Sequence, residues 1–293
     1  MTNDIRDQAY LSGSAVQKLN FVNDSGRYIF RKHYRSGLRS HIFEILMAED
    51  VLKETYGLDM DGVRMFPRAK PKKMFRILRN KFENKEEIFY EIKKYHILLK
   101  FLGPGFIAES DEFIVDYTGA GTSQIVLCGL QEYIEGEMLD PWRLFGEDYL
   151  RDLFKFNIHD DSQLQTLVRK AQKNIAEFVK RTRQMITDTG HIPDLAGVGN
   201  LILTPDGALK LVDINNIVKI KLDDSILIDD KGYPSCDISV EVLSILERKI
   251  LQKDIHTDDP LYRLFLSPER KKKVKALEKE FYKKFYVDKA WRS

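Results

Sequence analysis

The sequence predicts an α+β protein of 293 residues, with strands concentrated in its first half and long helices in its second. Three observations support this class. Alternating apolar residues at 113–117 and 123–136 indicate two strands. An apolar residue every three to four positions over 161–189 indicates a long amphipathic helix. A Pro-Asp-Gly turn at 205–207 between two short apolar runs indicates a β-hairpin.

The N-terminal third carries weaker signals. Aromatic-rich runs within 15–34 flank the turn sequence at 23–26, and this pattern predicts a hairpin. Apolar spacing over 38–56, followed by Gly57, predicts a helix. Residues 62–80 are expected to form a strand, a proline-broken turn and a second strand.

The elements after residue 83 are better defined. Residues 84–102 predict an amphipathic helix, with Asn84 as its N-cap and Gly103-Pro104-Gly105 as its end. Gly190 is the expected C-cap of the 161–189 helix. Residues 232–251 predict another buried helix, and 260–293 predict one or two charged helices.

Three polar residues lie around the predicted hairpin of the chain's middle. Asp194 and Asn200 precede its first strand, and Asp213 follows its second strand. A hairpin brings its open ends together, so Asn200 and Asp213 are expected side by side with Asp194 near them. Carboxylate and amide oxygens converging on a loop suit a hard cation and a phosphate.

The order of these residues resembles the catalytic loop and metal-binding strand pair of the protein-kinase-like fold, a superfamily that includes small-molecule kinases of the aminoglycoside phosphotransferase type. The family pattern is H-x-D, four residues, N, and then a hairpin that ends in D-F-G. In this chain His191 stands three residues before Asp194, and five residues separate Asp194 from Asn200. Asp213-Ile214-Asn215 occupies the position of D-F-G.

The resemblance implies a bilobal fold. A small antiparallel-sheet lobe would span 1–136, with a hinge at 131–136, and a mainly helical lobe would span 137–293. In such proteins Asp194 would orient the acceptor hydroxyl or accept its proton, and Asn200 and Asp213 would hold Mg²⁺ on the ATP phosphates. The hinge residues Gln131, Glu132 and Tyr133 would bind the adenine ring through their backbone.

The family also uses a cation on a strand, paired with a helix glutamate, to hold the first phosphates. Arg76 occupies the expected lysine position, and Glu91 of the following helix is its expected partner. Lys32, partnered by Glu44, is the competing candidate. Arg76 is preferred because its helix leads directly into the two strands and the hinge.

Other features bear on the subclass. Asp237 resembles the family's buried helix aspartate that braces the catalytic loop, and an ordinary helix-capping role would explain it equally well. The interval from Asp213 to Asp237 is short, and no A-P-E sequence follows, which favours a small-molecule kinase or an atypical bacterial kinase. Leu11-Ser12-Gly13-Ser14 is a poor glycine-rich phosphate loop.

The expected function is therefore ATP-dependent transfer of the γ-phosphate to a hydroxyl of a small molecule or a protein. The alternative is a catalytically degenerate, pseudokinase-type binding module, favoured by the missing glycine loop and the Arg-for-Lys exchange. The expected cofactors are ATP and Mg²⁺.

Composition limits the remaining classes. The chain is 43% hydrophobic and 31% charged with a net charge of +2, so bulk electrostatics gives no reason to expect nucleic-acid binding. The basic stretch at 64–81 predicts either a patch for nucleic acid or phosphate or a solvated hairpin, and the nearly balanced net charge favours the hairpin. Cys128 and Cys236 fit no disulfide framework or thiol metal site, and neither a signal peptide nor a membrane span is expected. These features favour the cytoplasm.

Overall fold

The chain combines antiparallel sheets with separate helices, as the α+β prediction requires, and it forms two compact units. Unit 1 comprises Met1–Lys93 and Ala108–Tyr133, and unit 2 comprises Lys94–Ile107 and Ile134–Ser293. The chain passes from unit 1 to unit 2 for the last time between Tyr133 and Ile134. The computed structural model describes residues 4–23, 26–34, 37, 39–119, 122–143, 148–155, 158, 160–255 and 258–290.

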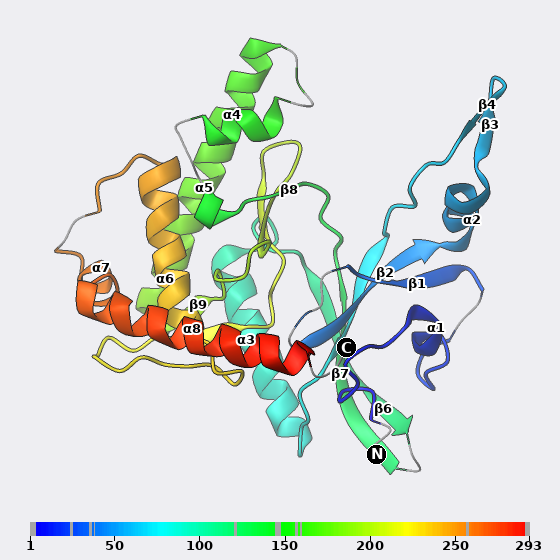
Figure 1. The fold of residues 1–293 in the computed structure, drawn as a ribbon, viewed down its shortest axis with the longest axis horizontal. Coiled ribbons are helices and arrows are strands. Elements are labelled where there is room, and N and C mark those ends of the chain that lie inside the picture. Colours follow the sequence, from blue (N-terminus) through cyan, green and yellow to red (C-terminus); the bar gives the residue numbers. More distant parts are fainter. Residues whose placement is uncertain are drawn as a thin grey trace. The chain divides into compact units, whose positions relative to one another are not determined.

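Unit 1 is built on an antiparallel sheet, which has five strands in the described residues (Figure 1). Their spatial order is β1-β2-β5-β7-β6. The predicted strands in 62–80, 113–117 and 123–136 are present, although the last one ends at Gln131. The five strands are β1 (Tyr28–Lys32), β2 (Ser40–Met47), β5 (Lys73–Leu78), β6 (Ser110–Gly119) and β7 (Thr122–Gln131).

The helix predicted over 38–56 is wrong in its first half. Residues Ser40–Met47 form strand β2, and only Ala48–Tyr56 form a helix, α2. β2 lies between β1 and β5, and apolar side chains are buried on both of its faces. A strand covered on both sides lacks the apolar–polar alternation that distinguishes it from a buried helix.

The hairpin predicted within 15–34 is also wrong. Residues Gly13–Val16 form a short helix, α1, and β1 pairs with β2 rather than with the preceding segment. Part of the turn, at positions 24 and 25, lies outside the described residues.

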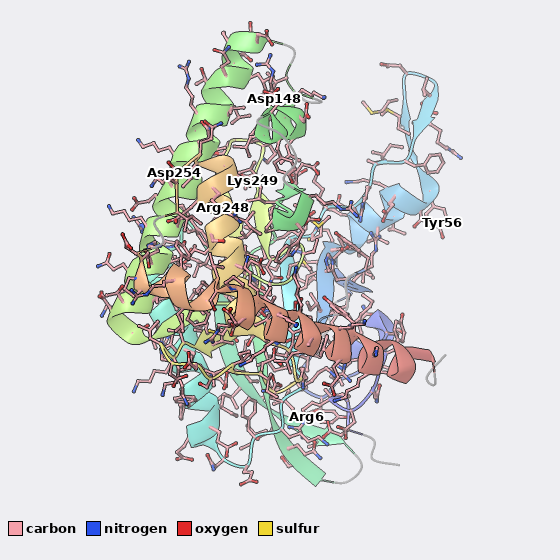
Figure 2. All side chains as sticks on the ribbon, turned by 60° about the vertical axis from the view of Figure 1, so that its left-hand side comes forward. Arg6, Tyr56, Asp148, Arg248, Lys249 and Asp254 are labelled. Atoms are coloured by element: carbon pink, nitrogen blue, oxygen red, sulfur yellow. The ribbon has the colours of Figure 1, made fainter. Side chains whose placement is uncertain are left out.

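The two faces of the sheet are covered by different segments. The N-terminal segment covers one face with Ile5, Leu11 and Val16, which pack with Phe43 and Phe75. Arg6 fixes this segment to β7 by donating hydrogen bonds to the Gln124 side chain and the Ile125 carbonyl (Figure 2). Helix α3 (Lys85–Leu102) covers the other face through Ile88, which packs with Leu78 and Leu127.

Helix α3 matches the predicted 84–102 segment and has the predicted cap. The Asn84 side chain accepts a hydrogen bond from the Glu87 amide at 3.0 Å. The first half of α3 belongs to unit 1 and its second half to unit 2, where Leu98 and Leu102 are buried.

A narrow ribbon extends from unit 1 beyond α2. Strands β3 (Leu58–Met60) and β4 (Val63–Met65) pair antiparallel around the Asp61–Gly62 turn. The ribbon points away from the sheet of the same unit (Figure 1).

Unit 2 is mainly helical, with a large apolar core. Its longest helix, α5, is the predicted one, and the Gly190 C-cap is left-handed with φ 63° as expected. Its helices are η1 (Pro141–Arg143), α4 (Tyr149–Phe154), α5 (Asp161–Thr189), α6 (Ser235–Ile245), the π-helical turn η2 (Leu246–Ile250), α7 (Pro260–Phe265) and α8 (Pro268–Ala290).

Short strand pairs connect α5 to α6. The predicted hairpin is present, with Leu201 opposite Leu211 and Leu203 opposite Leu209. A second pair, formed by β9 and β12, was not predicted. These strands are β8 (Glu137–Met138), which pairs with β10, then β9 (His191–Pro193), β10 (Leu201–Leu203), β11 (Leu209–Leu211) and β12 (Ile217–Lys219).

No helix among the described residues is long and apolar enough to cross a bilayer. Cys128 and Cys236 are both free thiols in the interior. Burial raises the pKa of the Cys236 thiol to about 12, so this side chain behaves as a small core residue.

Candidate functional site

Asp194 and Asn216 face each other where the β9–β12 pair ends. The Asp194 amide donates to the Asn216 carbonyl at 2.8 Å, which extends the strand pairing by one residue. The Asn216 side-chain amide donates to Asp194 Oδ2 at 2.5 Å, and the Ala196 amide donates to Asp194 Oδ1 at 2.8 Å. Asp194 is only 7% exposed. Its carboxylate is therefore oriented by two donors before any ligand is considered.

Asn200 joins this loop to the hairpin. Its side-chain Nδ2 donates to the Asp194 carbonyl at 3.0 Å. Its own carbonyl accepts the Val212 amide at 2.8 Å, one step beyond the last pair of the β10–β11 ladder. The structure thus brings Asp194 and Asn200 together, as the sequence predicted.

Asp213 follows Val212 directly, and so it lies at the open end of the same hairpin as Asn200. Its Oδ1 accepts a long, 3.4 Å hydrogen bond from the Asn215 amide, and the side chain is half-buried. We name Asp194, Asn200, Asp213 and Asn216 the loop cluster. Sequence reasoning missed Asn216 because its contact with Asp194 spans 22 positions.

The loop cluster is supported from below by Ser239 of α6. The fully buried Ser239 hydroxyl accepts the Leu195 amide at 3.0 Å. Asp237, the residue expected to brace the loop, instead forms an ion pair with Arg270 of α8. Arg270 Nε donates to Asp237 Oδ1 at 2.5 Å. The bracing assignment of Asp237 is therefore corrected to Ser239, two positions later on the same helix.

Arg76 of unit 1 is buried on the sheet face that α3 covers. Its Nη2 donates to the Ser110 hydroxyl at 2.9 Å and to the Glu112 carboxylate. The carboxylate that pairs with Arg76 therefore belongs to Glu112 of β6. The predicted partner, the half-buried Glu91 of α3, is wrong. Arg76 Nε is buried and has no acceptor among the described residues.

The competing candidate, Lys32, occupies another environment. Lys32 is paired with Phe43 across β1 and β2, and its Nζ lies 4.6 Å from the centre of the Phe43 ring. Burial, aided by the positive charge of Arg79, lowers the pKa of Lys32 to about 8. Its proposed partner Glu44 instead contacts His33 Nδ1 at 2.9 Å.

The predicted hinge residues are partly engaged within unit 1. The Gln131 side chain is buried and donates to the Ala108 carbonyl at 3.4 Å. The Glu132 amide donates to the Glu109 carbonyl at 2.8 Å, and Tyr133 is half-buried at the end of the unit. An adenine ring would have to use other backbone groups of 131–136.

Two side chains of the loop cluster keep oxygen atoms of the kind that Mg²⁺ prefers. Asp213 carries a carboxylate with one long hydrogen bond, and the Nδ2 bond of Asn200 leaves its Oδ1 as an acceptor. Oxygen ligands of this kind, one carboxylate with substrate phosphates, are typical of magnesium.

Two observations limit this fit. The described residues contain no group of three or more His, Cys, Asp or Glu side chains placed to hold a metal. A side-chain carbon on Gly13 would come within 1.7 Å of the Phe30 carbonyl oxygen. Close packing against β1 therefore accounts for this glycine without a phosphate.

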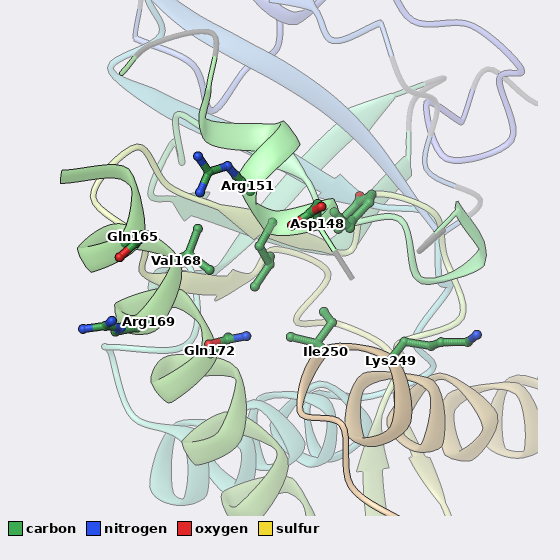
Figure 3. A pocket seen from close by; sticks show the side chains of 10 residues that line it. Asp148, Arg151, Gln165, Val168, Arg169, Gln172, Lys249 and Ile250 are labelled. Atoms are coloured by element: carbon green, nitrogen blue, oxygen red, sulfur yellow. The ribbon is translucent and has the colours of Figure 1, made fainter. Parts of the chain in front are cut away.

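A pocket of about 240 Å³ lies elsewhere in unit 2, between α4, α5 and η2 (Figure 3). Val168, Gln172 and Ile250 face one another across it, while the Arg169 and Lys249 side chains extend away in opposite directions. Asp148 and Arg151 also line the pocket, so its wall carries charges of both signs. Its lining includes none of the predicted site residues.

Comparisons with known proteins add no relative, since neither the protein-family models nor the curated proteins contain a match to this sequence.

Proposed function

We propose that the protein is a phosphotransferase similar to the bilobal protein-kinase-like enzymes, and that it moves the γ-phosphate of ATP to a hydroxyl. The acceptor would be a small molecule or a protein. One observation carries the proposal. Hydrogen bonds connect Asp194, Asn200 and the strand that leads to Asp213 at the open ends of two short strand pairs.

Each residue of the loop cluster would have a separate role. Asp213 and the Oδ1 of Asn200 would hold Mg²⁺, which neutralises charge on the phosphates of ATP. Asp194 would accept the acceptor's proton while the new O–P bond forms and the bond to the leaving ADP oxygen breaks. The hydrogen bonds that Asn216 and Ala196 donate hold this carboxylate in one orientation.

The sequence-based role of Arg76, contact with the non-transferred phosphates, is not part of this proposal, because its guanidinium is buried within unit 1 and bonded to Ser110 and Glu112. The proposed activity needs ATP, and the cytoplasm that the cysteine usage favours would supply it.

Nucleotide binding is tested by thermal unfolding with ATP and Mg²⁺, with ATP and a chelator, and with Mg²⁺ alone. A ligand at about 100 times its Kd stabilises the folded protein by about 2.7 kcal/mol, which gives a clear rise in Tm. The rise is expected only with ATP and Mg²⁺ together, and Asp213→Asn should abolish it. Asp224→Asn removes the same charge from an exposed site and should leave the rise unchanged.

Turnover is tested by ADP release with a panel of polyhydroxy compounds and of peptides containing Ser or Thr. We expect Asp194→Asn to retain the Tm rise and to lose ADP release. If no nucleotide changes the Tm of the parent protein, the proposal fails.

A pseudokinase-type binding module is the second candidate, and a specific observation favours it. Asp194 is 7% exposed and both of its carboxylate oxygens accept internal hydrogen bonds. This geometry suits a structural carboxylate as well as a catalytic one. A Tm rise with ATP and Mg²⁺, combined with no ADP release from any acceptor, would identify this second function.

A further inference from the structure

The projecting part of unit 1 exposes an unusual number of large apolar side chains. We name residues 48–73 the arm: it consists of α2, β3, β4 and the segment that ends at Lys73, the first residue of β5. Helix α2 has no buried residue, and Tyr56 lies exposed at its end (Figure 2). Beyond α2, Ala69 alone is buried among residues 57–73.

The β3–β4 ribbon has one apolar face. The strand register pairs Leu58 with Met65 and Met60 with Val63. Alternate residues of a strand share a face, so these four side chains lie together. They are between 37% and 63% exposed.

The polar pair Asp59 and Arg64 occupies the opposite face of the ribbon. Asp59 Oδ1 accepts the Gly62 amide and so stabilises the turn. Two-stranded ribbons are marginal in water. A ribbon with all of its aliphatic groups on one exposed side is therefore expected to bind something with that side.

The chain after the ribbon is cationic. Residues 66–73 carry Arg68, Lys70, Lys72 and Lys73 and no acidic residue, and all four are exposed. Exposed Phe66 stands between the ribbon and these cations. Of the acidic residues of α2, Asp50 contacts Lys53 at 3.1 Å and Glu54 contacts Arg31. Glu49 of α2 and Asp61 of the ribbon turn are exposed, so the cations are concentrated in 68–73 and not over the whole arm.

The size of the apolar face decides between possible partners. Three residues per strand give a length of about 10 Å, and two strands give a face on the order of 100 Å². Stable protein interfaces bury about 800 Å² per partner, far more than this ribbon offers alone. Peripheral lipid binding needs only a few inserted apolar groups together with cations near anionic headgroups.

We propose that the arm binds the surface of an anionic lipid bilayer. Met60, Val63, Met65 and Leu58 would enter the headgroup–acyl boundary, and the cations of 68–73 would contact the anionic headgroups. This inference is independent of the phosphotransferase proposal, because it uses no residue of the loop cluster.

Co-sedimentation with vesicles tests the proposal. The full chain should bind vesicles that contain phosphatidylglycerol, should bind phosphatidylcholine vesicles much more weakly, and should be released by salt. Each Lys or Arg near the surface contributes roughly fivefold, so Arg68→Gln/Lys72→Gln should weaken binding on the order of twenty-fivefold. Met60→Ser/Met65→Ser should also weaken it at least tenfold, as roughly expected for two inserted side chains.

Two matched controls keep the result specific. Lys272→Gln/Lys273→Gln removes equal charge from exposed positions of α8, and Leu222→Ser/Ile228→Ser removes exposed apolar groups outside the arm. Both controls should bind like the parent protein.

Three results would overturn the proposal. They are failure to sediment with the anionic vesicles, equal loss of binding in the control variants, and full binding by both arm variants. A concentration-dependent dimer in sedimentation equilibrium, removed by Met60→Ser/Met65→Ser and accompanied by no vesicle binding, would assign the ribbon to a second copy of the chain instead.

Discussion

The Arg76 guanidinium reaches the Glu112 carboxylate across a strand that lies between them. Arg76 of β5 and Glu112 of β6 are both paired with Gly129 of β7 in the strand register. The side chains of the ion pair are only 4% and 6% exposed. Because Gly129 has no side chain, the two charged groups can meet above its backbone. The contact between Arg76 and Glu112 over Gly129 explains why a residue without a side chain occupies this position of β7.

Removing either partner of this pair should destabilise the protein strongly. Breaking a buried ion pair costs about 3–5 kcal/mol, because one charge is left without compensation. We expect Arg76→Met and Glu112→Leu each to lower the free energy of unfolding by this amount. The double variant should lose much less than the sum, since no charge is then stranded. Urea unfolding of the four proteins measures the coupling, and additive losses would contradict it.

Gly129→Ala should also destabilise unit 1. An added methyl carbon would lie 2.7 Å from Arg76 Nη2 and 2.9 Å from both Glu112 Oε1 and Ser110 Oγ. Relieving such overpacking typically costs about 1–3 kcal/mol. Gly105→Ala is the control, because no atom lies within 4 Å of the added carbon there. An equal free energy of unfolding for the two variants would contradict the expected clash of the added methyl group with Arg76, Glu112 and Ser110.

The features that the sequence predicted correctly depend on local chemistry. Asn84 caps α3 and Gly190 caps α5 because capping requires only the residue and its immediate neighbours. The Pro205–Gly207 turn likewise determines the β10–β11 hairpin, and this brought Asn200 to the strand end before Asp213.

The features that sequence reasoning missed depend on distant pairing. Glu112 meets Arg76 only because of the β5–β7–β6 order, which no local pattern specifies. Asn216 and Ser239 reach the Asp194 loop across 22 and 44 positions. The helix predicted over the residues of strand β2 is wrong because burial on both faces removes the strand's period of two.

Ser239→Ala tests the support beneath the loop cluster. The Leu195 amide would lose its acceptor in the interior, and an unsatisfied buried donor costs about 1–3 kcal/mol. Ser244→Ala is the matched control on α6. The Ser244 hydroxyl donates to the Glu241 carbonyl of its own helix, so its loss should cost less. Chemical denaturation measures both variants, and a larger loss for Ser244→Ala would reverse the assignment.

His41 should make the stability of unit 1 depend on pH. The ring is 2% exposed, and its Nε2 donates to the Ile5 carbonyl at 2.9 Å. Burial, followed by the charges of Lys32 and Arg79, lowers the pKa of His41 from 6.5 to about 4. Between these two pH values the unfolded chain binds a proton that the folded chain does not. Stability therefore falls as the pH drops from 6.5 to 4, by about 3 kcal/mol for this shift.

Carboxylates titrate in the same range, so the comparison with a variant isolates the contribution of His41. His41→Gln can keep a donor towards Ile5 and removes the titration, and its free energy of unfolding should decline less steeply below pH 6.5 than that of the parent protein. His96→Gln replaces an exposed histidine of α3 and should follow the parent curve. Urea unfolding at a series of pH values gives the three curves. If the His41→Gln curve runs parallel to the parent curve from pH 6.5 to 4, then the protonation of His41 is not what links folding to pH.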